Sequence, residues 1–225
     1  MPFKAAFKAS DNLGNQIADY LSERIITGEL QPGERILEAR LAQELGVSRG
    51  PIREALFILE HKGTVKLVPR RGARVTEVSL PYIEWLYDVL IELYALTARK
   101  AAENRSNKDL AQIRRALKKI EQSAARGDYA GYYSAIFEFA SVGLLAAKNP
   151  VLTEIIADLE PGTRRVQFAS LSRRVEDLQR NVVFFKDVVR YVENKDPENA
   201  CQTIRTYAQN EKVFALNNRK ALPRK

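Results

Sequence analysis

Cysteine and histidine are almost absent from this sequence. Its 225 residues include one cysteine, Cys201, and one histidine, His61. A single cysteine forms no disulfide within the chain, which is typical of a reducing compartment. A single histidine excludes a site built from several histidine ligands. It also excludes a Ser-His or Cys-His hydrolase unless His61 itself is the base. We interpret Cys201 as a small helical residue. We interpret His61 as a residue at the end of a predicted helix, where a partly charged imidazole interacts favourably with the helix dipole.

Long apolar runs are also lacking. No run approaches the roughly 18 to 20 residues needed to span a bilayer. Residues 1–10 contain Lys4 and Lys8 but no apolar segment followed by a small-residue cleavage site, so we expect no signal peptide. The expectation is a cytoplasmic protein with no membrane partner.

Positive charge, by contrast, is in excess. The chain has 36 Lys and Arg against 28 Asp and Glu, a formal net charge of +8, which favours anionic partners such as nucleic acid. Between Val47 and Thr76 the only acidic residues are Glu54 and Glu60. The basic residues of this segment are Arg49, Arg53, Lys62, Lys66, Arg70, Arg71 and Arg74.

Three helices and a hairpin are predicted in the N-terminal third. Apolar residues recur at helical spacing from Leu13 to Ile25, and Gly28 ends that helix. Residues 38–45 predict a second, short helix. Ser48 is expected to cap a third helix by accepting a hydrogen bond from a backbone amide of its first turn. Residues 65–68 and 73–76 then predict two strands around a basic turn.

This order of elements is that of a winged helix-turn-helix. The exposed start of the third helix would meet base edges in the major groove, where arginine bonds guanine at two acceptors. Arg49 and Arg53 are four residues apart and therefore share one helical face. The hairpin tip would reach a minor groove or a flanking phosphate. A merely solvated basic face is the alternative, but the coincidence of the turn, the serine, the arginine spacing and the hairpin favours DNA binding.

The remaining chain is helical throughout, and Ser79-Leu80-Pro81 is the expected junction because proline disfavours helix before it and suits the first turn after it. The predicted fold class is therefore mainly α. A winged helix-turn-helix domain occupies residues 1–78, and an all-helical antiparallel bundle occupies residues 79–225.

The first domain resembles the GntR family of bacterial transcription regulators, through residues 25–35, 41–56 and 69–75. A threonine is common in that family where Gly50 stands, so one phosphate-contacting hydroxyl is missing here. The resemblance implies DNA contacts from the third helix and the wing. The implied residues are Ser48, Arg49, Gly50 and Arg53 on the helix, with Arg70, Arg71 and Gly72 at the wing.

The second domain is similar to the FCD domain of the FadR-type branch, partly through residues 146–152. This resemblance implies a homodimer that binds a palindromic double-stranded operator and responds to a small metabolite inside the bundle. Many FCD domains bind a divalent metal with one aspartate and three histidines. Those positions fall on Ile136, Ala140, Phe185 and Tyr207, which are not normal metal ligands, and an effector-pairing arginine position falls on Leu90. We therefore expect no metal and no cofactor.

Two states of this central cavity remain open. In the first, side chains such as Phe137, Phe139 and Phe185 fill the cavity, no effector binds and the protein binds DNA constitutively. In the second, the cavity is apolar and binds an apolar ligand such as an acyl chain. Both are favoured over a small-carboxylate site rebuilt from other residues. The expected function is a DNA-binding transcriptional regulator, a repressor, controlled by a small molecule. An enzyme on the helical domain is disfavoured because no paired-carboxylate motif is present, and a membrane-surface role for the basic residues 219–225 is disfavoured because they lack an amphipathic helix.

Overall fold

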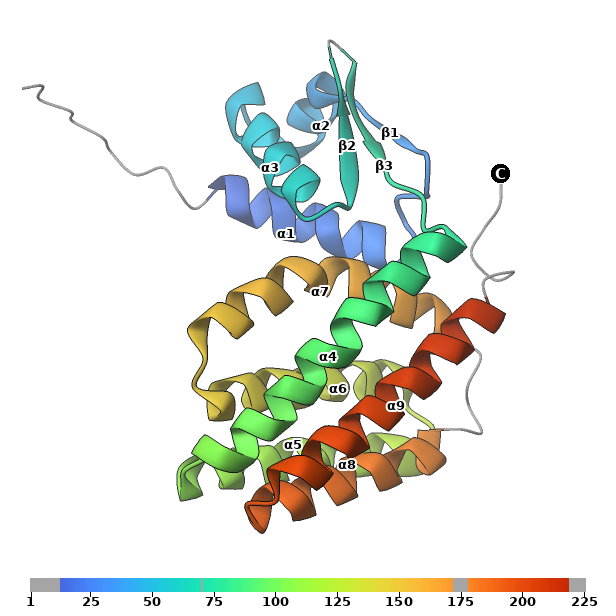
Figure 1. The fold of residues 1–225 in the computed structure, drawn as a ribbon. Coiled ribbons are helices and arrows are strands. Elements are labelled where there is room, and N and C mark those ends of the chain that lie inside the picture. Colours follow the sequence, from blue (N-terminus) through green and yellow to red (C-terminus); the bar gives the residue numbers. More distant parts are fainter. Residues whose placement is uncertain (1–12, 70, 172–177, 219–225) are drawn as a thin grey trace, which may run out of the picture. The chain divides into compact units, whose positions relative to one another are not determined.

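The computed structural model describes residues 13–69, 71–171 and 178–218 (Figure 1). The chain divides into two compact units, Met1–Glu77 and Val78–Lys225. Residues of the N-terminal segment, Arg70 at the expected wing tip and the basic segment 219–225 lie outside the described residues. The described part is mainly helical, with one small sheet in the first unit, which confirms the predicted fold class.

The first unit packs three helices against a three-stranded sheet. Its core joins Leu21 and Ile25 of the first helix to Leu56 and Leu59 of the third, all almost fully buried. The elements are α1 (Leu13–Ile26), β1 (Arg35–Ile36), α2 (Glu38–Leu45), α3 (Arg49–His61), β2 (Val65–Val68) and β3 (Gly72–Val75).

The sheet has the order β1-β3-β2 and is antiparallel throughout. The sequence pattern did not predict β1, because a two-residue strand carries no periodicity. The returning strand begins at Gly72 rather than Ala73, since Gly72 pairs directly with Val68. Gly72 has a φ of 82°, and a Cβ atom there would clash with the carbonyl oxygen of Ile36. Glycine at this position therefore allows β1 to approach the hairpin.

The second unit is a bundle in which six helices are described. Polar N-caps start several of them: Ser79 accepts from the Tyr82 amide at 3.2 Å, and Ser106 forms a reciprocal capping box with Asp109. These caps satisfy amides that have no partner within the helix. The helices are α4 (Leu80–Asn104), α5 (Asn107–Ala125), α6 (Tyr129–Ala147), α7 (Pro150–Leu171), α8 (Leu178–Glu193) and α9 (Pro197–Asn217).

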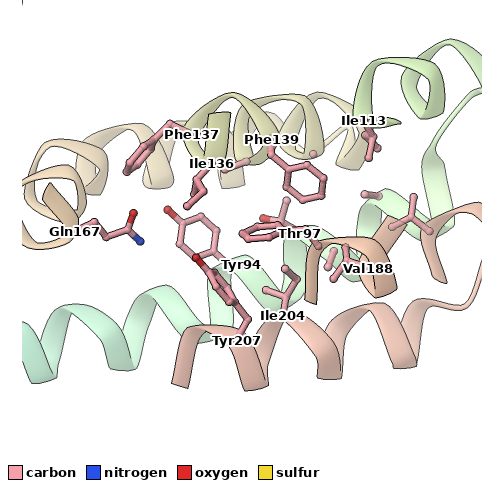
Figure 2. A pocket seen from close by; sticks show the side chains of 16 residues that line it. Tyr94, Thr97, Ile113, Ile136, Phe137, Phe139, Gln167, Val188, Ile204 and Tyr207 are labelled. Carbon is pink, nitrogen blue, oxygen red and sulfur yellow. The ribbon is translucent and has the colours of Figure 1, made fainter. Parts of the chain in front are cut away.

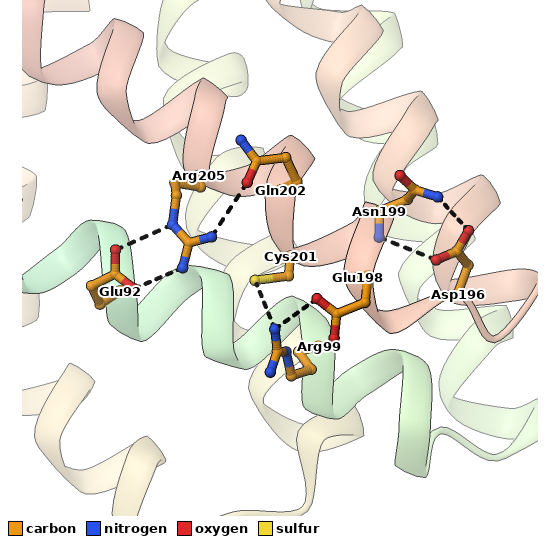
Figure 3. A network of polar contacts seen from close by, with 8 residues as sticks. All are labelled: Glu92, Arg99, Asp196, Glu198, Asn199, Cys201, Gln202 and Arg205. Atoms are coloured by element: carbon orange, nitrogen blue, oxygen red, sulfur yellow. Dashed lines mark hydrogen bonds and ion pairs between the residues drawn. The ribbon is translucent and has the colours of Figure 1, made fainter.

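Helices α4 and α9 lie side by side, as Figures 1 and 3 show. Ala208 and Ala215 of α9 are buried in one apolar cluster with residues of α4 that include Ile83 and Leu90. At the margin, Arg205 forms two hydrogen bonds to Glu92, at 2.7 and 3.2 Å, and Arg99 pairs with Glu198 at 2.9 Å. Exposed ion pairs contribute little stability each, so their main effect is to fix the alignment of the two helices.

One described helix, α6, is long and apolar enough by length and composition to cross a membrane, with a mean hydropathy of 1.2. The expectation that no segment approaches such a length was therefore wrong for residues 129–147. In the structure α6 packs against α4, α5 and α7 within the bundle. The core helix of a bundle meets the same criterion, so this composition is weak evidence for a membrane span.

The role of Gly72 is testable by a matched pair of substitutions. Gly72→Ala is expected to destabilise the wing by at least about 3 kcal/mol, because it adds a steric clash to the cost of a positive φ. Gly46→Ala should cost only about 1 to 2 kcal/mol, since Gly46 has a φ of 66° but open space around it. The Val75 amide donates to the backbone carbonyl oxygen of Glu34 at 2.9 Å. Hydrogen exchange at this amide measures the effect of both substitutions in the 225-residue chain. Equal losses in the two variants would contradict the close-approach argument.

Candidate nucleic-acid interface and ligand cavity

Helix α3 buries one face and exposes its two arginines on the other. Ile52, Leu56 and Leu59 are fully buried against α1 and the sheet. Arg49 and Arg53 are exposed on the other face, at the N-terminal end of the helix. Because the buried face fixes the rotation of α3, these two arginines point away from the core as predicted.

Ser48 is the N-cap residue of α3 and is exposed, but its side chain makes no capping hydrogen bond. The predicted cap by the serine hydroxyl was therefore wrong. The amides of the first turn of α3, together with the Ser48 hydroxyl, are left available for an external acceptor such as a phosphate oxygen. Gly50 beside them is exposed, with open space where a side chain would lie.

The two arginines differ in their partners. The Nε atom of Arg53 donates to Oε2 of Glu38 at 2.7 Å, which ties the start of α3 to α2. No ion pair involves Arg49 in the part of the chain that the structure describes. Arg49 is therefore the more available of the two for an anionic partner, while Arg53 is already oriented by a carboxylate. The sequence pattern had predicted the same role, a DNA contact, for both arginines.

The wing is joined rigidly to the end of α3. A carboxylate oxygen of Glu60, on α3, accepts from the Leu67 amide of β2 at 2.8 Å, and the Thr64 hydroxyl donates to the Leu59 carbonyl at 3.1 Å. The Thr76 hydroxyl donates to the Gly63 carbonyl at 2.8 Å, closing the base of the hairpin. Sequence reasoning missed these positioning residues, because a threonine or glutamate near a turn has no distinctive spacing.

At the wing tip, Arg71 is exposed and its amide donates to the Val68 carbonyl at 2.9 Å. Gly72 serves the geometry of the turn, as described above. Arg70, predicted as a wing contact, lies outside the described residues. Arg74 is engaged elsewhere, because its guanidinium donates to the Gly33 carbonyl at 2.7 Å. Among the described wing residues, Arg71 is thus the arginine most available to an external anion.

The second unit contains a cavity of about 80 Å³ inside the bundle (Figure 2). Four of the five residues expected around a central cavity line it: Ile136, Ala140, Phe185 and Tyr207. The fifth, Leu90, does not; it is buried in a separate apolar cluster with Ile83 and Leu86. The lining residues that the sequence analysis did not place there include Tyr94, Thr97, Val188 and Gln167.

The lining fits neither a metal nor a charged anchor. It contains no Asp, Glu, His, Cys, Lys or Arg. Within residues 13–69, 71–171 and 178–218, no group of three or more His, Cys, Asp and Glu is arranged to hold a metal ion. The donor set that a divalent metal needs is therefore not present around this cavity.

Aromatic rings form one wall of the cavity. The ring centroids of Phe139 and Phe185 are 5.2 Å apart, and those of Phe185 and Tyr207 are 4.8 Å apart, both edge to face. Such pairs are favourable at these distances and hold each other in place. The rings thus shape the cavity as well as narrow it, and they do not fill it.

A few polar groups interrupt this apolar lining. The Thr97 hydroxyl is satisfied, since it donates to the Leu93 carbonyl at 2.8 Å. Burial is the main cause that raises the pKa of the Tyr94 hydroxyl, with a further rise from Glu160, so Tyr94 stays neutral. Gln167 is 7% exposed, and its Oε1 atom is buried without a hydrogen-bond partner among the described residues. A polar side chain at an inward helix position carries no sequence signal of its own, so only the packing reveals it.

Both units match known protein families. Residues 13–75 match the family described as bacterial regulatory proteins, gntR family, and residues 85–210 match the FCD domain. The HTH-type transcriptional regulator McbR of Escherichia coli (strain K12) is 28% identical over 144 residues, covering 64% of this chain and 65% of that protein. The uncharacterized HTH-type transcriptional regulator YdhC of Bacillus subtilis (strain 168) is 32% identical over 112 residues, half of each chain. The matched segments thus span half to just under two thirds of these relatives.

Solved structures show the same fold over nearly the whole chain. E. coli McbR/YncC has a TM-score of 0.80 at 23% identity, covering 92% of this chain and 98% of that one. The Lar protein that controls the agr system of Listeria monocytogenes has a TM-score of 0.63 at 24% identity, covering 94% and 98%. Both relatives named above are described as HTH-type transcriptional regulators.

The unpartnered Gln167 makes a stability prediction. Gln167→Leu should stabilise the second unit by about 1 to 2 kcal/mol, because it replaces a buried unsatisfied acceptor with an apolar group of similar size. Thr163→Val on the same helix is the control: its hydroxyl donates to the Leu159 carbonyl at 2.9 Å, so its removal should give no such gain. Urea unfolding followed by far-ultraviolet circular dichroism reports mainly on this unit, which holds most of the helical residues. A loss of stability in Gln167→Leu would contradict the assignment.

Proposed function

The chain belongs to the GntR family of bacterial regulatory proteins and carries the FCD domain, and from this membership we propose that it regulates transcription by sequence-specific binding to double-stranded DNA. The observation that carries the proposal is the exposed N-terminal end of α3, where Arg49 stands without an ion pair in the described part of the chain. An arginine at this position of a helix in the major groove reads guanine. Ser48 and Gly50 contact phosphate, and Arg53 adds a contact whose orientation Glu38 controls.

The wing supplies the second set of contacts. Arg71 reaches a flanking phosphate or a minor groove, with Arg70 beside it in sequence, and Gly72 holds the turn in shape. Because Glu60 and Thr64 tie the hairpin to α3, the two contact surfaces move as one body. Because of this coupling, a shift of α3 on the DNA also shifts the position of the wing on the DNA.

A homodimer binding a palindromic operator is the assembly we propose. On α4, three exposed apolar residues, Trp85, Val89 and Leu96, recur at intervals of four and seven, so they form one stripe. Trp85 is 67% exposed, which is unusual for so large an apolar side chain. Covering this stripe with the same stripe of a second copy gives a two-fold dimer, and a two-fold dimer matches a palindrome.

The bundle cavity is the site we propose for a small-molecule signal. Its volume favours a ligand over the alternative of a completely filled core and a constitutive DNA binder. An apolar ligand suits the lining, whereas a long acyl chain exceeds about 80 Å³ without rearrangement. We further propose that the protein is a repressor, because a dimer bound to its operator excludes other proteins from that DNA until the ligand alters the affinity of the dimer for DNA. We propose that it acts in the cytoplasm.

The DNA-reading role of Arg49 is tested by Arg49→Ala. With a sequence selected from a random DNA library by the purified chain, the variant should bind about 1 to 3 kcal/mol more weakly and with relaxed base preference at one position. Arg115→Ala on α5, an exposed arginine of the other unit, is the control and should leave binding unchanged. Fluorescence anisotropy against the selected and a scrambled duplex measures both. Equal losses on the two duplexes would show that Arg49 contacts only phosphate.

The dimer surface is tested by Trp85→Glu. A carboxylate buried within the apolar stripe should shift the protein toward monomer at concentrations where the unaltered chain is dimeric, as sedimentation velocity measures. Val183→Glu on α8 is the control, because Val183 is similarly exposed but lies on a different helix. Dimers that persist in Trp85→Glu would place the interface elsewhere.

A further inference from the structure

Gln167 stands out in the bundle because its amide oxygen is buried without a partner among the described residues. A buried acceptor that loses its hydrogen bond to water and gains none in return is costly, so such groups in folded proteins call for an explanation. The cavity beside Gln167 supplies one. A ligand that donates a hydrogen bond to Oε1 would satisfy this atom.

The cavity is polarised along its length. Figure 2 shows the amide of Gln167, from α7, turned into the cavity, with the hydroxyl of Tyr94, from α4, on the same side. The opposite end is lined by Ile113, Val188 and Phe139. One end therefore offers hydrogen bonds and the other only apolar surface.

Charge restricts the ligand further. No lining residue is ionisable apart from the two tyrosines, and burial raises the pKa of Tyr94, so it does not ionise near neutral pH. A carboxylate or phosphate inside would lose its hydration and meet no cation among the lining residues, which is unfavourable. The ligand must therefore be uncharged.

The volume sets its size. A buried water needs about 10 to 15 Å³ of comparable space, so a cavity of about 80 Å³ holds roughly five to eight non-hydrogen atoms. The edge-to-face rings of Phe139, Phe185 and Tyr207 suit a flat or branched apolar body of that size.

We propose that this cavity binds a small uncharged ligand, with an aromatic or compact apolar body and one hydroxyl that donates to Gln167. Its regulatory meaning rests on the proposed function, but the binding itself does not. Gln167 is the residue that determines specificity, since its buried amide oxygen lacks a partner in the described part of the chain. Tyr94, which also lines the cavity, offers the ligand oxygen a neutral donor.

The test compares three aromatic probes. Phenol has a ring and a hydroxyl, toluene has the same number of non-hydrogen atoms but no hydroxyl, and benzoate carries a charge. Each is titrated into the 225-residue chain, without DNA, while amide chemical shifts are recorded by NMR. Phenol should shift the amides of α4, α7 and α8, and its Kd should be roughly three- to tenfold below that of toluene. Benzoate should give no saturable shifts at these amides.

Two variants separate the hydrogen bond from the cavity. Gln167→Leu should raise the Kd of phenol roughly three- to tenfold and leave that of toluene unchanged or lower. Ala140→Leu, which adds bulk at a lining position, should abolish binding of both probes. Circular dichroism confirms that each variant is folded.

The outcomes distinguish this inference from the proposed function. Equal affinities for phenol and toluene, or an unchanged preference in Gln167→Leu, would overturn the assignment of Gln167. Saturable binding of benzoate would overturn the requirement for an uncharged ligand. The same protein is assayed separately on the selected DNA without any probe. If the protein shows no specific DNA binding but prefers phenol to toluene, the proposed regulator is refuted and the ligand site is not. If it binds DNA specifically but shows no preference for phenol, only the ligand site is refuted.

Discussion

The complete burial of one face of α3 is the constraint on which the proposed DNA-binding surface depends. Ile52, Leu56 and Leu59 are sealed against α1 and the sheet, so α3 has a single rotational setting. That setting places Arg49 outside, and Glu60 and Thr64 extend the same rigidity into the wing. Apolar packing, rather than any attraction between charges, therefore decides where the positive charge of this unit is presented.

The second unit follows the opposite rule and keeps charge out of its interior cavity. Ion pairs such as those of Arg205 and Arg99 lie at the margin of α4 and α9, where water screens them and where they fix alignment more than stability. The cavity lining is left to apolar and aromatic side chains and a few neutral polar groups. A low-dielectric space of this kind strengthens any hydrogen bond made inside it, so one amide is enough to discriminate between ligands. An unsatisfied group at that point lowers stability in the free protein, which is a common cost of a binding site.

Sequence reasoning succeeded where a pattern repeats and failed where a single contact decides. Apolar residues at helical spacing placed α1, α2 and α3 correctly, and the hairpin was displaced by only one residue. The cap by Ser48 failed, because a favoured residue type at a helix start does not guarantee its hydrogen bond. Leu90 was expected at the cavity and lies in another cluster, since one helical offset turns a side chain to a different neighbour. The family motif that suggested both sites gave their location in sequence and not their contacts.

The sequence by itself determined the mainly helical fold class and the basic face of α3, and it shows directly that the chain has only one histidine. Each of these depends on composition or on periodicity along one element, which the order of residues states directly. Only the tertiary structure decided that Arg53 pairs with Glu38 while Arg49 does not, and that Gln167 turns an unpartnered amide into an apolar cavity. These facts arise from contacts between residues far apart in the chain, and a buried polar group has no signature until the surrounding helices close around it.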